Sequence, residues 1–473
     1  MHLHDAAAEE LTEAIVRYAV DRVRMDPVPL DGPRSPAELA AACGPTITAG
    51  GLGGQRALDL FAEVLAPACI SIDHPRYLSF VPCAATEAAV LFDLVVGASS
   101  VYGGSWMEGA GAVFAENAAL RWIADLAGMP PTAGGVFVSG GTAGNLSALL
   151  AARSQWRRRA GGALDRVRGL VVASAGAHSS VAQAARVMDV DVVAVAADPA
   201  GRMSGSSLRA ALDALTGTDL ARMFAIVATA GTTNAGVIDD LAGAADAAEA
   251  TGCWLHVDGA YGGAALAAPS RRERFAGIER ADSFIVDPHK WLFAPFDSCA
   301  LLYRDPQIAR EAHTQHAEYL DVLHEPHGEV GTVGTAAEHE RDWNPSDFAH
   351  HLTRRARGLP FWFSLAAHGT EAYAQAIEAT LAVAHAGAEL IRQSAHCELV
   401  VEPELSVVVF RRLGWERADY QAWSDHLLAT GEGFVMPTAW EGETVLRICV
   451  VNPRTTVDDL RFLVDSLADA PER

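Results

Sequence analysis

An aspartate and a lysine lie at the ends of two apolar runs, where both would reach one cofactor. Asp258 follows the run 254–257, and Lys290 follows the run 283–286 in the sequence Val-Asp-Pro-His-Lys-Trp. A carboxylate at the end of a buried strand can lie against a pyridine nitrogen, and a lysine amine can bind an aldehyde. Asp258 alone is typical of a helix cap and Lys290 alone of a solvated surface, but together they predict a pyridoxal 5'-phosphate (PLP) enzyme. Asp258 would be the electron-sink partner and Lys290 the Schiff-base lysine.

A glycine-rich turn supplies a candidate phosphate site. The sequence Ser-Gly-Gly-Thr at 139–142 follows the apolar run 135–138 and leads into a helical pattern. Backbone amides at such a helix start, together with Ser and Thr hydroxyls, favour a phosphate. Most glycine-rich turns only reverse the chain, and this one lacks both the GKT or GKS ending of a nucleotide P-loop and the spacing of a dinucleotide fingerprint. The phosphate of the cofactor is therefore its expected ligand.

Two more turns bring polar side chains to the ends of apolar runs. His178 lies in Ala-His-Ser-Ser at 177–180, and Thr233 lies in Ala-Gly-Thr-Thr at 230–233. A histidine in such a place is often structural, and a threonine there often caps a helix. At the carboxyl end of a strand, however, His178 would stack on a flat cofactor ring, and the threonine hydroxyls would hold its phenolic oxygen or the substrate.

The apolar runs must be strands of one sheet if these residues are to meet. Between about residues 76 and 310, short apolar runs alternate with helical segments, which predicts an α/β fold with a mainly parallel, seven-stranded sheet covered by helices. In such sheets, ligands bind at the carboxyl ends of the strands. The predicted strands are residues 135–138, 169–173, 191–195, 224–229, 254–257, 283–286 and 299–303.

The flanking regions have different patterns. Residues 1–75 form amphipathic helical segments that would not bury both faces alone, so we expect them to pack on a partner subunit. From residue 360 onward, helical stretches give way to strands at 399–401, 405–410 and 444–450. The sequence thus predicts an N-terminal helical dimerisation segment (1–75), a large PLP-binding domain (76–359) and a small C-terminal α+β domain (360–473).

The composition is that of an ordinary globular protein and disfavours several kinds of partner. The 473 residues are 50% hydrophobic and carry a formal net charge of −23, so nucleic acid and anionic membrane surfaces are unfavourable partners. The seven cysteines are scattered and form no CxxC pair, so neither a disulfide framework nor a metal site is expected. The N-terminus shows no signal-peptide pattern, and no apolar stretch is long enough to span a bilayer. A cytoplasmic location is expected.

Taken in order, the motifs resemble those of the group II PLP-dependent amino-acid decarboxylases. The chain carries Ser-Gly-Gly-Thr, Ala-His-Ser-Ser, Ala-Gly-Thr-Thr, His-Val-Asp-x-Ala-Tyr-Gly-Gly and Pro-His-Lys-Trp in the order of that family, and the similarity runs from about His74 to Arg357. The family includes decarboxylases of aromatic amino acids, histidine, glutamate and cysteine sulfinate. The resemblance implies the fold of aspartate aminotransferase (fold type I) and a homodimer whose active sites lie at the subunit interface.

The resemblance also implies roles for individual residues. Lys290 would carry PLP, Asp258 would form an ion pair with the ring nitrogen, and His178 and Ala260 would cover the two faces of the ring. Thr233 would lie near the phenolic oxygen. Three residues would contact or border the phosphate: Gly141, Thr142 and His289.

The chain departs from the family pattern beside the lysine. Asp287 stands where the family usually has an asparagine near the phosphate. A carboxylate there would repel the phosphate unless it points away or is neutralised. The sequence leaves its orientation open.

The expected substrate pocket differs as well. The resemblance implies aromatic side chains after the His-Pro-Arg segment and before Ser-Trp. This chain keeps Phe80 but continues with Val81, and it has Gly104 where a phenylalanine is expected and Tyr102 in place of a smaller aliphatic residue. With Trp106, these residues would line a reshaped flat pocket. An aromatic L-amino acid is the expected substrate, with the amine and CO2 as products; a glutamate, diaminobutyrate or aliphatic substrate is left open.

One missing residue leaves the product open. The resemblance implies a loop tyrosine that protonates the substrate carbon, and its loss would favour oxidative formation of an aldehyde. The segment 325–342 is polar and typical of a loop, and residues 341–353 contain no tyrosine but include His350 and His351, either of which can donate a proton. The alternatives are therefore a decarboxylating aldehyde synthase, a carbon–carbon lyase, an aminotransferase and a non-catalytic protein of this fold.

Overall fold

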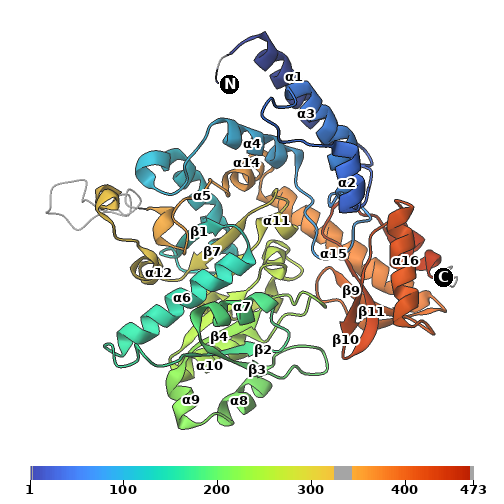
Figure 1. The fold of residues 1–473 in the computed structure, drawn as a ribbon. Coiled ribbons are helices and arrows are strands. Elements are labelled where there is room, and N and C mark those ends of the chain that lie inside the picture. Colours follow the sequence, from blue (N-terminus) through green and yellow to red (C-terminus); the bar gives the residue numbers. More distant parts are fainter. Residues whose placement is uncertain (1, 3, 324–342, 469–473) are drawn as a thin grey trace.

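A seven-stranded sheet forms the centre of the protein (Figure 1). The computed structural model describes residue 2, residues 4–323 and residues 343–468, so the segment predicted as a loop at 325–342 lies outside the described residues. The strand order is β1-β7-β6-β5-β4-β2-β3, and β7 runs antiparallel to both of its neighbours. The strands are β1 Gly134–Val138, β2 Leu170–Ser174, β3 Asp191–Val195, β4 Met223–Thr229, β5 Trp254–Asp258, β6 Ser283–Val286 and β7 Cys299–Tyr303.

The sheet confirms the predicted α/β class and the seven strands. Strands β2, β4, β5 and β6 are wholly buried, which explains why the sequence shows them as continuous apolar runs. These four strands are parallel, and β1 points the same way because two antiparallel pairings separate it from β6. Their carboxyl ends therefore meet at one edge of the sheet. The residues that end these strands are Val138, Ser174, Thr229, Asp258 and Val286.

Helices cover both faces of the sheet. On one face, α5, α8 and α10 share a hydrophobic core with Leu255 and Phe284. On the other face, α6, α7 and α12 pack with Val171 and Ile285. Neighbouring residues of one strand thus belong to opposite cores, as the alternation of a strand requires. These helices are α5 Trp106–Leu126, α6 Gly141–Arg159, α7 Ser179–Met188, α8 Gly205–Asp213, α10 Leu241–Thr251 and α12 Pro306–His313.

The N-terminal helices contribute little to either core. Figure 1 shows α1, α2 and α3 along one side of the molecule. Neither α1 nor α2 contains a buried residue, and Ile15 and Val16 of α1 are 43% and 44% exposed. These helices are α1 Ala6–Val23, α2 Pro36–Cys43 and α3 Gly54–Leu60, followed along the chain by α4 Glu87–Ala98.

The C-terminal part carries a second, antiparallel sheet in the order β10-β11-β9-β8. Three of its strands lie at the predicted places, while the short strand β10 was not predicted. Core residues of β9 and β11 join the hydrophobic core beneath the large sheet, so the division at residue 360 stays a prediction. Within the described residues, no helix has the length and apolarity needed to cross a membrane. The elements are α14 Leu359–His368, α15 Thr370–Gln393, β8 Cys397–Val401, β9 Val407–Arg412, α16 Arg417–Ala429, β10 Pro437–Trp440, β11 Glu443–Cys449 and α17 Val457–Ser466.

Candidate active site

The polar residues singled out in the sequence meet at the carboxyl edge of the large sheet. They line a cavity of about 250 Å³ beside the ends of β1, β4, β5 and β6. The lining also contains residues without a predicted role, including Asn145, Ser180, Thr229 and Phe296. All eight residues predicted to bind a cofactor are in the lining: Gly141, Thr142, His178, Thr233, Asp258, Ala260, His289 and Lys290.

Lys290 and Asp287 form an ion pair on one side of this cavity. Lys290 lies in the short helix α11 (Pro288–Trp291), and its Nζ is 2.9 Å from Oδ2 of Asp287. Burial, the largest single effect, lowers the pKa of Lys290, but the charge and hydrogen bond of Asp287, together with the charge of Asp258, raise the pKa overall. Burial raises the pKa of Asp287, whereas Lys290 and His289 bring that pKa below its usual value. The orientation that the sequence left open is therefore toward the lysine.

Lys290 is the only lysine in the chain. An aldehyde that binds an amine has this one side chain available, besides the terminal amine of Met1. The count is visible in the sequence and would have singled out Lys290 without any motif. Sequence reasoning overlooked this signal.

Asp258 lies at the end of β5 in the lining of the same cavity and is 4% exposed. Its Oδ1 accepts a hydrogen bond from the backbone N–H of Ala260 at 3.1 Å. Its Oδ2 accepts a hydrogen bond from Nδ2 of Asn145 at 2.8 Å. Each oxygen thus has a donor within the protein while the carboxylate still borders the cavity.

His178 lies at the rim, where it caps the start of α7. Its Nδ1 is 2.8 Å from Oγ of Ser180 and 3.2 Å from the backbone nitrogen of Ser180. These two contacts on one nitrogen hold the imidazole against the end of the helix. His178 belongs to the lining of the cavity.

The start of α6 forms an anion site in the wall of the cavity. The N-cap residue Gly140 has no side chain to cap the 19-residue helix, so its first amides keep their hydrogens available. A Cβ atom added to Gly141 would lie 3.1 Å from Cβ of Ala260 and 3.3 Å from Oδ2 of Asp287. Glycine at this position therefore keeps the helix start open.

Two buried polar atoms in the lining lack a hydrogen-bond partner within the described part of the chain, Oγ1 of Thr229 and Oδ1 of Asp287. Buried polar atoms are normally paired, so such atoms mark the place of a missing partner. A cofactor with a phosphate, a ring nitrogen and an aldehyde matches the three features of the cavity: the start of α6, the carboxylate of Asp258 and the amine of Lys290. The residues present fit PLP.

The chain matches the family profile described as "Pyridoxal-dependent decarboxylase conserved domain" over residues 55–413. The chain belongs to the pyridoxal-dependent decarboxylase family. It is 31% identical to an aromatic-L-amino-acid decarboxylase of Bacillus atrophaeus, over 82% of this chain and 79% of that protein. It is also 31% identical to an L-2,4-diaminobutyrate decarboxylase of Rhizobium meliloti (strain 1021), over 86% of this chain and 81% of that protein.

A solved structure of Oryza sativa TDC with PLP and tryptamine has the same fold as this decarboxylase. The TM-score is 0.86 at 24% identity, with 99% of this chain and 98% of that chain covered. The decarboxylase is thus a PLP-dependent carboxy-lyase that acts on an amino acid, and its fold is the one predicted from the sequence. Its relatives are named for different amino acids, so membership of the family leaves the substrate undecided.

The residues predicted for the substrate pocket do not line the Lys290 cavity in the single chain of this decarboxylase. Phe80 is 61% exposed, and Val81 packs against the core of the large sheet. Tyr102, Gly104 and Trp106 lie at and just before the start of α5. A Cβ atom added to Gly104 would lie 2.5 Å from Cζ of Tyr102. The tyrosine ring thus occupies the space that a larger residue at Gly104 would need.

The two histidines considered as proton donors also lie outside the lining of this cavity. Nδ1 of His350 is 2.9 Å from Oγ of Ser147. Burial, aided by nearby positive charges, lowers the pKa of His351 to about 3. His351 is therefore neutral at ordinary pH, and the structure brings neither histidine to Lys290.

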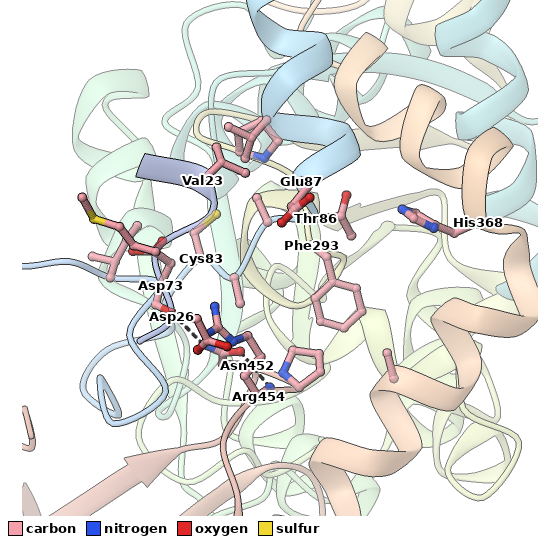
Figure 2. A pocket seen from close by; sticks show the side chains of 18 of the residues that line it. Val23, Asp26, Asp73, Cys83, Thr86, Glu87, Phe293, His368, Asn452 and Arg454 are labelled. Carbon is pink, nitrogen blue, oxygen red and sulfur yellow. Dashed lines mark hydrogen bonds and ion pairs between the residues drawn. The ribbon is translucent and has the colours of Figure 1, made fainter. Parts of the chain in front are cut away.

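Figure 2 shows a larger cavity, of about 950 Å³. Phe296 belongs to the lining of this cavity and also to that of the Lys290 cavity. The walls of the larger cavity come from α1, α4, α15 and the segment after β11. Two arginines in these walls are paired with carboxylates: Arg22 with Asp73 at 2.9 Å, and Arg454 with Asp26. The aromatic side chains in the walls are Phe293, Phe296 and Tyr373.

Proposed function

We propose that this decarboxylase removes the carboxylate of an aromatic L-amino acid and releases the amine and CO2. The observation that carries the proposal is the meeting of the only lysine, Lys290, with Asp258 in one cavity at the carboxyl edge of the sheet. PLP supplies an aldehyde that binds the amino group of the substrate and a ring that takes up the electron pair left when CO2 departs.

Each predicted cofactor-binding residue of the cavity has a proposed role. Lys290 would hold the cofactor through its amine and give way to the amino group of the substrate. Asp258 would keep a proton on the ring nitrogen, because an adjacent carboxylate favours the charged form of that nitrogen. His178 and Ala260 would hold the ring between them. The start of α6, with Gly141 and Thr142, and His289 would bind or border the phosphate, and Thr233 would lie near the phenolic oxygen.

The larger cavity favours a flat apolar side chain on the substrate. An aromatic ring buried there is worth about 1.5–3 kcal/mol relative to water. Arg22 and Arg454 already have carboxylate partners, so an acidic side chain would have to compete with an existing ion pair. This arrangement supports an aromatic substrate over glutamate or cysteine sulfinate.

L-2,4-diaminobutyrate is the second candidate substrate, favoured by one carboxylate. Glu87 is exposed and lines the larger cavity (Figure 2). A carboxylate in that position can accept a charge-assisted hydrogen bond from a cationic side chain. Replacing Glu87→Gln would abolish most activity on diaminobutyrate if that is the substrate, and would leave activity on an aromatic amino acid nearly unchanged.

The remaining wall of the substrate pocket is proposed to come from a second copy of the chain. Large apolar side chains lie exposed on two neighbouring helices: Leu94 (46%) and Val95 (49%) on α4, and Met107 (56%) and Phe114 (63%) on α5. Clustered exposed apolar groups mark association surfaces. In the proposed homodimer, residues 1–75 would clasp the partner, and the segment with Tyr102 and Trp106 would border the partner's cavity. Sedimentation of the purified protein would show a dimer.

Product analysis tests the proposal. The PLP-loaded protein is incubated separately with tryptophan, tyrosine, phenylalanine, glutamate and diaminobutyrate while CO2, O2 and the organic product are measured. We expect an amine and CO2 from an aromatic amino acid without O2 uptake, and neither product from the Lys290→Arg variant. An aldehyde with O2 uptake would instead show an aldehyde synthase, and turnover of diaminobutyrate alone would overturn the aromatic assignment.

A further inference from the structure

We propose that Asn145 is a positioning residue that aligns Asp258 and His178 with the cofactor through one fixed set of hydrogen bonds. This inference deepens the proposed function and rests on it, because it explains how the cavity presents those two groups to PLP. Asn145 lies in the first turns of α6, is 1% exposed and lines the cavity. Its side chain links β5, which ends in Asp258, to α7, which begins after His178.

The amide of Asn145 makes three short hydrogen bonds. Nδ2 lies 2.8 Å from Oδ2 of Asp258 and 2.8 Å from Oγ of Ser180, and Oδ1 lies 2.8 Å from Nε2 of His256. An ionised carboxylate accepts hydrogen bonds and donates none, so the NH2 group must face Asp258. Charge therefore sets the orientation of the amide, and its oxygen must face His256.

The same argument assigns the hydrogen on His256. Because Oδ1 of Asn145 only accepts, Nε2 of His256 must carry the hydrogen. Burial lowers the pKa of His256 to about 4, so the ring is neutral and its Nδ1 accepts. The hydroxyl of Ser283 donates to that Nδ1 at 2.8 Å and itself accepts from Nε1 of Trp254 at 2.7 Å. The hydrogen bonds thus form a chain from Trp254 through Ser283, His256 and Asn145 to Asp258, and each one is donated toward Asp258.

The second hydrogen of the amide extends the set to the histidine at the rim. Ser180 accepts from Nδ2 of Asn145, so its own hydroxyl hydrogen is available to Nδ1 of His178 at 2.8 Å. In its neutral form, His178 then carries its hydrogen on Nε2. One side chain thus connects the carboxylate proposed to face the ring nitrogen with the imidazole proposed to cover the ring.

Loss of the amide would disconnect both groups. Asp258 would keep the backbone N–H of Ala260 on Oδ1 and would lose the side-chain donor on Oδ2. Nε2–H of His256 would be buried without its acceptor. Because hydrogen bonds donated to a carboxylate favour its ionised form, the ring nitrogen would hold its proton less firmly.

Two cofactors and two variants test the proposal. Asn145→Leu removes the amide at nearly constant volume, and Ser147→Ala on the same helix is the control, because its hydroxyl contacts His350 outside the cavity lining. Each apoprotein is titrated with PLP and with an analogue whose ring nitrogen is replaced by CH, so that both ligands bind through the aldehyde but only PLP pairs with Asp258. We expect Asn145→Leu to weaken PLP at least about tenfold and the analogue much less, with Ser147→Ala unchanged for both.

A nitrogen-15 NMR spectrum of bound, labelled PLP reads the ring nitrogen directly. We expect the protonated position in the wild type and a shift toward the unprotonated position in Asn145→Leu. Should that variant fail to fold, Asn145→Ala gives the same shift, since alanine has no hydrogen to donate to Asp258 and adds no charge beside it. Equal weakening of both ligands, or an unchanged nitrogen signal, would overturn the proposal. If the two proteins differ as expected but the wild type releases no CO2 from any amino acid, the proposed function is contradicted and this inference stands.

Discussion

The two carboxylates of the Lys290 cavity, Asp258 and Asp287, differ in how completely their oxygens are paired. On the Asp258 side, Asn145 bonds at 2.8 Å to Asp258, to Ser180 and to His256. On the Lys290 side, the ion pair with Asp287 spans 2.9 Å, while Oδ1 of Asp287 has no hydrogen-bond partner among the described residues.

This difference indicates that the two sides of the cavity have different roles. Fixed hydrogen bonds place a group before the ligand arrives, so the Asp258 side needs no reorganisation when the cofactor binds. The Lys290 side must change, because its ammonium group is paired with Asp287 and only a neutral amine attacks an aldehyde. We therefore expect changes on the lysine side to act on the rate of cofactor uptake, and changes on the Asp258 side to act on the affinity for PLP and on the reaction.

The largest effect is expected from Lys290→Arg, which breaks the lysine side. The arginine keeps a positive charge beside Asp287 but has no amine that can bind an aldehyde. Decarboxylation should fall by orders of magnitude and the visible absorption of the lysine-bound cofactor should vanish, as read by CO2 release and by spectrophotometry. Normal turnover by this variant would show that another group holds the cofactor.

Asp258→Asn removes the carboxylate of the Asp258 side. The amide cannot supply the negative charge that keeps the ring nitrogen protonated, so kcat should fall by orders of magnitude. Because Lys290 is untouched, the cofactor should still bind covalently and absorb visible light. Steady-state kinetics together with an absorption spectrum check this. A variant that loses turnover only in proportion to lost cofactor would contradict the separation of the two sides.

Asp287→Asn sharpens the comparison with a smaller effect. The negative charge of Asp287 raises the pKa of Lys290, so its removal lets burial, the largest single effect, lower that pKa. Neutral amine then forms at lower pH, and the rate of PLP uptake by the apoprotein should rise at a lower pH than in the wild type. Stopped-flow absorption over a pH series measures this. An unchanged pH profile would show that the ion pair does not control the amine.

The smallest effect is expected in stability. His256 is fully buried, and burial lowers its pKa to about 4, whereas in the unfolded chain it titrates near its ordinary value of about 6.5. Between these two pH values the unfolded chain binds a proton on His256 that the folded protein does not bind. The free energy of unfolding is therefore highest above about pH 6.5 and falls by about 3 kcal/mol as the pH decreases toward 4. Denaturant titrations of the apoprotein should show a shallower pH slope in His256→Gln. Identical slopes would show that His256 is not neutral in the folded protein.

Much of the site was predictable because parallel strands bring their ends to one edge. The apolar runs before Asp258 and Lys290 became β5 and β6, and this alone places both residues at one cavity. The short strand β10 was missed because residues 437–440 show no sustained alternation. Asn145 stood within a recognised motif, but its role depends on His256 and Ser180, which reach it only through tertiary packing.

The substrate wall was less predictable, for a physical reason. The residues proposed from sequence, such as Phe80 and Tyr102, lie outside the Lys290 cavity of one chain. Helical and strand patterns describe how a chain packs on itself. They do not place one subunit against another, so a pocket shared by two copies, as we propose, would leave no spacing pattern in the sequence.

The most direct test of this account is borohydride reduction of the PLP-loaded protein followed by peptide mass mapping. Reduction fixes the cofactor on the amine that holds it, and Lys290 is the only lysine in the chain. We predict a single pyridoxyl phosphate group on the peptide that contains Lys290 and its absence in Lys290→Arg. Label on the amine of Met1 alone, or no label despite bound cofactor, would contradict the assignment of the active site.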